Sequence, residues 1–255
     1  MSIRRLALST ALVALVAAAA WALGDAWVSA QDDPEEAQNL EIILHDNDIV
    51  WRTAPGTVVR AIVNANGQQK AQTPNRVADE TGLVSLPLQG GGGGGPGGGF
   101  GGGQRLEPGD QIVLIPEDGP RYAATIPAMA LGIDVAADMV FGSAPAGAEL
   151  TIETGGGQTG NATAAGDGSF AWDLAGTEDL VHGSQAFARH TTDANNTFTV
   201  YGAALLVEVA IGSFVVGGTG TPGDEIVISS EAPDGTVRGP YDTTVTGGTD
   251  FQMLH

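Results

Sequence analysis

The amino-acid sequence predicts an all-β protein in which tandem β-sandwiches follow an N-terminal signal peptide. Short stretches of alternating apolar and polar residues recur along the chain, and turns rich in Gly, Asn and Asp separate them. After residue 30, no stretch has the apolar periodicity of an amphipathic helix. Two facing sheets bury the alternating apolar side chains of both, so a sandwich is favoured over a single open sheet.

The first 30 residues have the pattern of an export signal. Arg4 and Arg5 precede an apolar run from Leu6 to Leu23, and Val28-Ser29-Ala30 supplies the small residues that a signal peptidase accepts. Because the run is long enough to span a bilayer, an uncleaved signal anchor is the alternative. We assign residues 1–30 to a signal peptide.

The composition excludes several classes of function. The chain has 10 Lys and Arg residues against 30 Asp and Glu, which gives a net charge of −20. Such a chain repels nucleic-acid phosphates and anionic membrane surfaces. We therefore expect no nucleic acid as a partner, and no membrane contact beyond the signal segment. The absence of cysteine excludes disulfides, thiolate zinc sites and cysteine catalysis. Export without disulfides is typical of bacteria, and we expect a secreted or cell-surface bacterial protein.

Three glycines mark an internal repeat. Gly56, Gly147 and Gly223 lie 91 and 76 residues apart, and each follows a proline by one or two positions. A register shared by three segments predicts three copies of one β module. At the same offsets, alternate apolar residues precede each glycine: Leu40, Ile42 and Leu44; Leu131, Ile133 and Val135; Val207, Val209 and Ile211.

The repeat sets the domain boundaries. After an acidic linker at residues 31–38, the sequence predicts one sandwich at residues 39–127 and a second at residues 128–204. Residues 205–255 are expected to form a partial third sandwich, because the alignment ends before the counterparts of the closing strands. The side chains that we expect in the cores are Val59, Ala61, Leu86, Leu150, Ile152, Phe170 and Trp172.

An insertion interrupts the first copy. Gly82 corresponds to Gly168 at an offset of 86, whereas Leu106 corresponds to Leu180 at an offset of only 74. The difference is accounted for by the glycine-rich tract of residues 90–103. Because such a tract has almost no side chains to bury, we expect it to form a flexible loop.

Turn and strand motifs carry a family resemblance. The second copy has Pro145-Ala146-Gly147, Asp167-Gly168-Ser169-Phe170 and Leu180, and the first has Pro55-Gly56, Thr81-Gly82-Leu83-Val84 and Leu106-Glu107-Pro108-Gly109-Asp110. In these motifs, residues 39–255 resemble the bacterial Ig-like repeats of secreted and surface proteins. They are also similar to the carboxypeptidase-regulatory-like sandwich. The resemblance implies a spacer, stalk or adhesive module, and it implies no catalytic residue.

The sequence contains no set of residues with the spacing of a known catalytic motif. Its histidines, His45, His182, His190 and His255, lack the spacing of metal ligands. There is neither a Gly-x-Ser-x-Gly nucleophile elbow nor a phosphate-binding glycine loop with its lysine. The sequence therefore predicts that the protein is not an enzyme and carries no cofactor, with calcium as the one open alternative.

Acidic residues near strand ends are the candidate calcium ligands. Asp46, Asp48, Asp134 and Asp138 offer the hard carboxylate oxygens that calcium takes in repeated extracellular sandwiches. Neither an EF-hand loop nor a calcium-binding nonapeptide accompanies them. A solvated acidic surface that keeps the protein soluble is the alternative interpretation.

These observations predict a non-enzymatic structural or adhesive repeat protein at the bacterial cell surface, acting as a spacer or an interaction module. Its partner would be a protein or a polysaccharide at that surface. The alternative is a carbohydrate- or ligand-binding accessory region of a larger secreted enzyme.

Overall fold

The computed structural model describes residues 33–88, 105–209, 215–221, 224–231, 234–245 and 250–254. Within these ranges the regular structure is entirely β, in the strands β1–β21, which confirms the predicted all-β class. In the described ranges we find no helix that is long and apolar enough to cross a membrane. The predicted signal peptide and the glycine tract lie outside the described residues.

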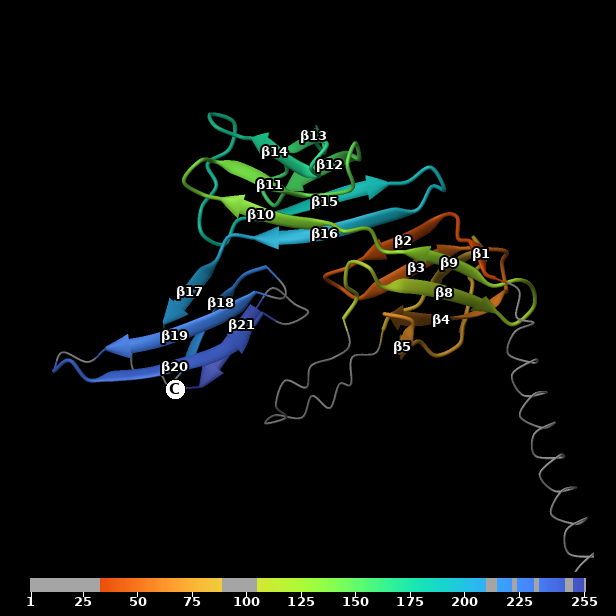
Figure 1. Ribbon diagram of the computed structural model, residues 1–255, viewed down its shortest axis with the longest axis horizontal. Helices are drawn as coiled ribbons and strands as arrows, with labels where there is room; N and C mark the ends of the chain where they lie inside the picture. Colours follow the sequence, from red (N-terminus) through yellow and green to blue (C-terminus); the bar gives the residue numbers. More distant parts are fainter. Residues whose placement is uncertain are drawn as a thin grey trace, which may run out of the picture.

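A first set of strands, β1–β9, forms two sheets (Figure 1). One sheet contains β2, β3 and β7, and the other has the order β1-β9-β8-β4-β5, with β6 also paired to β4. The bounds are β1 Glu35–Glu36, β2 Leu40–Ile43, β3 Asp48–Arg52, β4 Val58–Ala65, β5 Gln68–Gln72, β6 Arg76–Val77, β7 Leu83–Ser85, β8 Gln111–Pro116 and β9 Tyr122–Thr125.

A second set, β10–β16, repeats this arrangement. Strands β10, β11 and β14 form one sheet, and β13-β12-β15-β16 run in order through the other. The bounds are β10 Ala130–Asp134, β11 Met139–Ser143, β12 Glu149–Thr154, β13 Thr159–Thr163, β14 Ser169–Asp173, β15 Gln185–Thr191 and β16 Thr197–Ala203.

A third set, β17–β21, contains a sheet of order β17-β18-β21 and the pair β19-β20. In Figure 1 it extends at the lower left, with the second set above it and the first set to the right. The bounds are β17 Leu206–Val209, β18 Val215–Thr219, β19 Glu225–Glu231, β20 Val237–Thr244 and β21 Asp250–Leu254.

The same turn precedes β4, β12 and β19. In each turn an amide donates a hydrogen bond to the carbonyl three residues earlier, and the three donors lie 91 and 76 residues apart, at the predicted offsets. Strands β4, β12 and β19 therefore correspond, as do β8 and β15 in the first two sets. The three bonds join Thr57 to Ala54, Ala148 to Pro145, and Asp224 to Thr221.

Alternating apolar residues build a core that the first and second sets share. Strand β4 buries Val59, Ala61 and Val63 between less buried neighbours, and β12 buries Leu150 and Ile152 in the same way. This alternation follows from the two-residue period of a strand, which sends successive side chains to opposite faces. The residues buried as predicted are Val59, Ala61, Leu86, Leu150, Ile152 and Phe170.

Trp172 differs from the prediction because it is only half-buried. It packs against the edge of the shared core, and a Cβ added to Gly160 would meet its indole ring at 2.4 Å. The indole therefore lies on the backbone of Gly160 in β13, which is an edge strand. A tryptophan at a sheet edge has neighbours on one side only, so part of its ring remains in water.

Part of the segment expected to be an acidic linker is a strand. In β1, Glu35 and Glu36 pair in parallel with Tyr122 and Ala123 of β9, and the following Ala37 is fully buried. The two glutamate side chains are exposed. The charged side chains predicted a solvent-exposed linker. The backbone groups of the same residues nevertheless form hydrogen bonds with the edge of β9.

Backbone pairing also joins the first and second sets. Strand β16 pairs in parallel with β2, so that Glu41, Ile42 and Ile43 lie opposite residues 197–199. As a result, β13-β12-β15-β16-β2-β3-β7 form one continuous seven-stranded sheet. The two sets therefore lie edge to edge, and their relative orientation is fixed by a ladder of hydrogen bonds rather than by a linker alone.

Candidate functional site

The candidate site is the junction at which the strand sets meet. At its centre, the side chain of Asn196 is inserted between the backbones of the first and second sets. Its Oδ1 accepts a hydrogen bond from the Leu40 amide at 3.0 Å, and its Nδ2 donates to the Ala37 carbonyl at 2.7 Å. Asn196 is 3% exposed, so these bonds satisfy backbone groups that water does not reach.

A pair of asparagines closes the same junction. The Nδ2 of Asn195 donates to the Oδ1 of Asn39 at 2.7 Å. Both residues have positive φ angles, 58° and 57°, in the left-handed region that asparagine tolerates better than most residues. No periodic pattern in the sequence marks Asn39, Asn195 or Asn196, because their partners lie far away in the chain.

A cavity of about 380 Å³ lies beside this junction. All three strand sets line it, with His45 and Arg105 from the first, Tyr201 from the second and Asp224 from the third. Apolar side chains, among them Leu131, complete the wall. The cavity thus combines an aromatic ring, groups of both charge signs and an apolar lining.

Arg105 links the first and third sets across this cavity. Its Nη1 donates to the carbonyl of Val245 at 3.3 Å. Burial lowers the pKa of Arg105, against the opposing effect of the Glu107 carboxylate. A partly desolvated guanidinium keeps its charge and retains further N–H donors for a guest or for water.

His45 occupies the wall nearest the second set. Its ring centroid lies 5.5 Å from that of Phe187 and 5.1 Å from that of Tyr201. Burial lowers the pKa of His45, and the nearby Asp46, whose Oδ2 is 3.4 Å from Nε2, raises it by less. Its Nδ1 is buried without a hydrogen-bond partner among the described residues. The neutral imidazole therefore acts mainly as an aromatic packing surface.

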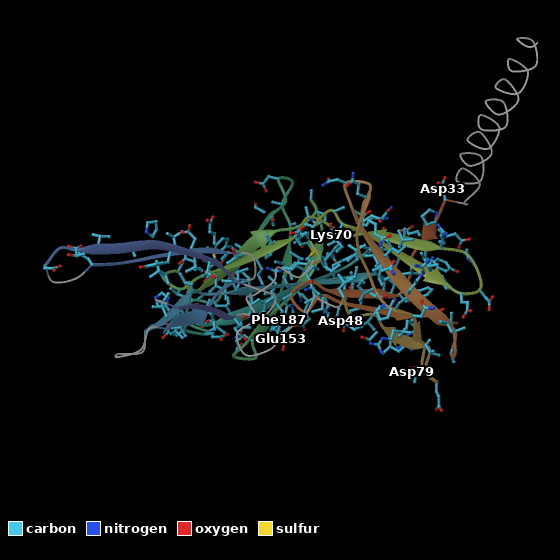
Figure 2. The ribbon with its side chains drawn as sticks, turned by 90° about the horizontal axis from the view of Figure 1, so that it is seen from below. Asp33, Asp48, Lys70, Asp79, Glu153 and Phe187 are labelled. Atoms are coloured by element: carbon cyan, nitrogen blue, oxygen red, sulfur yellow. The ribbon has the colours of Figure 1, made fainter. Side chains whose placement is uncertain are left out.

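The four candidate calcium ligands lie at two separate hairpins. Asp46 is in the turn between β2 and β3, and Asp48 is the first residue of β3, where its Oδ1 accepts a hydrogen bond from the Ser85 hydroxyl at 3.0 Å. Asp134 is the last residue of β10, and Asp138 is in the turn between β10 and β11. Within the described ranges, no three His, Asp or Glu side chains converge as a metal site would require. Figure 2 also shows Asp48 well apart from Asp79, another acidic residue near a strand end.

Asp134 and Asp138 have structural partners. The Asp134 Oδ1 accepts hydrogen bonds from two amides of its own turn, at 2.9 and 3.1 Å. The Asp138 Oδ1 accepts one from the Leu180 amide at 2.9 Å. In the first set, the Oδ1 of Asn47 accepts from the Leu106 amide at 2.8 Å, at the corresponding position. A neutral amide and a carboxylate thus make the same contact, so this contact does not require the negative charge.

A partly buried cluster of charged side chains also has no signal in the sequence pattern. The Lys70 Nζ lies 2.6 Å from the Glu107 Oε2 and 2.9 Å from the Asp110 Oδ2, and the Asp110 side chain is 4% exposed. Burial disfavours the Lys70 charge, but the bonds to the two carboxylates outweigh it and raise the pKa of Lys70. The Asp110 Oδ2 also accepts a hydrogen bond from the Glu107 amide at 2.9 Å. In the second set Ser184 replaces Asp110, and its Oγ accepts the equivalent bond from the Val181 amide at 2.9 Å.

Comparison with known proteins gives structural neighbours only. No protein-family model matches the chain, and no curated protein matches it. Among solved structures, it is similar to the BSP domain of a biofilm-associated protein, with 15% identity, a TM-score of 0.26, and coverage of 66% of this chain and 29% of that one. It is also similar to a structure concerned with host cell-surface retention of a 1.5-MDa bacterial ice-binding adhesin, with 11% identity, a TM-score of 0.22, and coverage of 86% and 87%.

Proposed function

We propose that the protein is a non-enzymatic structural or adhesive protein of the bacterial cell surface, in which tandem Ig-like modules form a stiff spacer. The observation that carries the proposal is the parallel pairing of β16 with β2. Modules joined by a flexible linker reorient freely, whereas modules that share one sheet hold a fixed geometry. A fixed geometry suits a stalk that must hold a binding surface at a distance from the cell.

The junction has the properties of a permanent contact. Asn196 satisfies two backbone groups of the first set, and a single apolar core continues from the first set into the second. Opening the junction would expose this core and leave buried amide and carbonyl groups without partners. The cost of opening therefore favours a single orientation of the two modules.

The histidines support a structural rather than a catalytic role. The Nδ1 of His182 donates to the Leu205 carbonyl at 3.0 Å, and the Nδ1 of His190 donates to the Glu149 carbonyl at 3.1 Å. His45 packs between aromatic rings. These contacts use the three imidazoles to hold local structure together, as a structural module requires.

Two measurements test this proposal. Intact bacteria that express the full chain with an epitope tag should bind the tag antibody, and external protease should remove the signal. Residual dipolar couplings of the purified chain should fit one common alignment tensor for the first two strand sets. Separate tensors would contradict the stiff spacer, and an epitope accessible only after lysis would contradict the surface location.

An activity screen tests the non-enzymatic part of the proposal. The purified chain should turn over no peptide, ester or glycoside substrate. Turnover that survives repurification, and that a single acidic substitution abolishes, would contradict it.

Carbohydrate binding is the second candidate function, and the cavity beside the junction favours it. Its volume of about 380 Å³, its aromatic ring and its charged groups of both signs suit one sugar unit. Calorimetric titration with a panel of oligosaccharides should then show saturable binding. Arg105→Gln should remove this binding, and unchanged affinity in that variant would exclude the cavity as the site.

A further inference from the structure

Strand β13 is an edge of the seven-stranded sheet and lacks the features that usually protect such an edge. Among the described residues it pairs with β12 alone, in a regular register along its whole length. Its sequence contains neither a charged residue nor a proline. Natural proteins commonly blunt edge strands with charge, proline or a bulge. In Figure 1, β13 lies at the top, on the side of the second set that faces away from the third.

The corresponding edge of the first set is protected. Strand β5 pairs with β4 as β13 pairs with β12, but a register shift between Val63 and Asn64 interrupts the ladder. In addition, β5 contains Lys70, and Pro74 follows it. The two sets join through β16 and β2, on the far side of β12 and β15 from β13. The repeat therefore leaves this position as an edge in both sets, and only β13 is left unprotected.

Every second residue of β13 directs its backbone hydrogen-bonding groups away from β12. Successive residues of an antiparallel strand point these groups alternately toward the partner and away from it. Two bonds of 2.9 Å fix the alternation at the ends of the β12–β13 hairpin, from the Thr154 amide to the Gln158 carbonyl and from the Ala164 amide to the Ala148 carbonyl. The residues whose backbone groups face the open edge are Thr159, Asn161 and Thr163.

The sequence of β13 is nearly symmetric about Asn161. In an antiparallel pair of two copies centred there, Asn161 lies opposite itself and Thr159 lies opposite Thr163. These are the residues with outward backbone groups, so the two strands can hydrogen-bond without a change of register. Threonines opposite one another form a favourable cross-strand pair. A two-fold contact requires one self-complementary patch, and β13 is such a patch.

Trp172 adds an apolar contact at the same edge. Its half-buried indole lies on the backbone of Gly160, and the neighbouring Ala162 is also half-buried. In the two-fold pair, Ala162 of the second copy lies opposite Gly160, beside the exposed part of the indole. Covering this part removes apolar surface from water. The edge thus offers backbone groups and an apolar contact to one occupant.

We propose that β13 is a docking site for β13 of a second copy of the chain, in an antiparallel pair centred on Asn161. The nearest carboxylates, Glu149 and Glu153, lie on β12, opposite Thr163 and Thr159. Across the pair they are three strand spacings apart, about 14 Å, which exceeds the Debye length of about 8 Å. Five residues from each copy make a small interface, so crowding of copies at a surface would favour the pair. This inference does not depend on the proposed function.

A cysteine at the two-fold axis tests the pair directly. The chain contains no cysteine, so Asn161→Cys introduces one thiol per copy. Opposed residues of a hydrogen-bonded antiparallel pair have Cα atoms about 5.5 Å apart, which suits a disulfide. Mild oxidation of the purified full chain should therefore give a covalent dimer. Thr151→Cys is the control, because Thr151 is exposed on β12 opposite Asn161. Its thiols would lie about 14 Å apart and should give about tenfold less dimer.

Opposite charges at the axis test the register. Asn161→Asp and Asn161→Lys each place like charges opposite one another and should weaken self-association about threefold to fivefold. An equal mixture of the two variants should associate more tightly than either alone. The same substitutions at Thr151 should show neither effect. Sedimentation velocity measures the association, and circular dichroism checks that each variant keeps the β structure.

Two outcomes would overturn the proposal. The first is covalent dimer formation by Asn161→Cys that is no greater than that by Thr151→Cys, which would show random collision. The second is self-association that responds equally to charge at the two positions, or that the charge at Asn161 leaves unchanged, because the contact would then lie elsewhere. Neither outcome bears on the fixed geometry of the first two sets, which residual dipolar couplings test separately.

Discussion

The Asn196 side chain accepts a hydrogen bond of 3.0 Å from the Leu40 amide, although 156 residues separate the two in sequence. The two residues lie at opposite sides of the junction between the first two strand sets. Their bond continues the ladder that pairs Thr197, Phe198 and Thr199 with β2. One side chain therefore helps to fix the orientation of two sandwich-like units.

Replacing this side chain should loosen the junction. Asn196→Ala leaves the Leu40 amide and the Ala37 carbonyl buried without partners, and each orphaned group is costly. We expect the free energy of unfolding to fall by about 2 to 4 kcal/mol. Urea denaturation followed by tryptophan fluorescence measures the change.

A matched control is available on an exposed strand. Asn161 in β13 accepts only a long bond from the Thr151 hydroxyl, at 3.3 Å, and is exposed. Asn161→Ala should therefore change stability by less than about 0.5 kcal/mol. Equal effects of the two substitutions would show that Asn196 has no special place in the junction.

The correspondence of Asp138 with Asn47 gives a second prediction. Asp138→Asn keeps an acceptor for the Leu180 amide and a residue that tolerates a φ of 49°, so stability should change by less than about 0.5 kcal/mol. Asp138→Ala removes the acceptor and strains the turn, and should cost about 2 to 4 kcal/mol. Thermal unfolding with calcium and with a chelator checks both. Calcium-dependent stabilisation that Asp138→Asn abolishes would show that Asp138 is a calcium ligand.

His45 predicts a loss of stability on acidification. Its pKa is lowered by burial from the ordinary value of 6.5, so the unfolded chain binds the proton more tightly. Stability should therefore fall as the pH drops below about 6.5 and level off below the lowered pKa. Asp46 opposes this shift only in part, and Arg105, Glu107 and Asp224 line the same cavity.

Replacing His45 by a ring that does not titrate distinguishes its contribution to the pH dependence of stability from that of the many carboxylates of the chain. His45→Phe keeps the aromatic contacts with Phe187 and Tyr201 but cannot take up a proton. The urea midpoint of this variant should lose the part of its pH dependence between neutrality and the lowered pKa. An unchanged pH profile would assign the dependence to other groups.

The ion pair of Lys70 and Asp110 gives a double-mutant test. Lys70→Met leaves the buried Asp110 carboxylate without its cation, which should cost about 1 to 3 kcal/mol. Adding Asp110→Ser reproduces the arrangement of Ser184 in the second set and should restore most of that loss. Urea denaturation of both single variants and the double variant gives the coupling. Simple additivity would mean that the pair contributes nothing specific.

Side-chain patterns predicted the parts of the fold that depend on local sequence. The alternation around Val59 and Leu150 identified the inward faces of β4 and β12, because a strand places every second side chain on the same face. The turn glycines located the strand ends, and Gly56 and Gly147 adopt φ angles of 79° and 77°, which favour glycine. These features require only the chain and its immediate neighbours.

The strand pairs at the sheet edges and at the junction between the first two sets could be identified only from the tertiary structure. The pairing of β1 with β9 and of β16 with β2 uses backbone groups that nearly every residue carries, so no pattern of side chains marks the partner strand. Likewise, the bond between the Asp138 carboxylate and the Leu180 amide joins residues 42 positions apart, so the local sequence around Asp138 does not indicate it. Local patterns of residues specify the period, the turns and the inward faces. Which edges meet, and what each polar side chain contacts there, depended on residues distant in the chain being brought together in space.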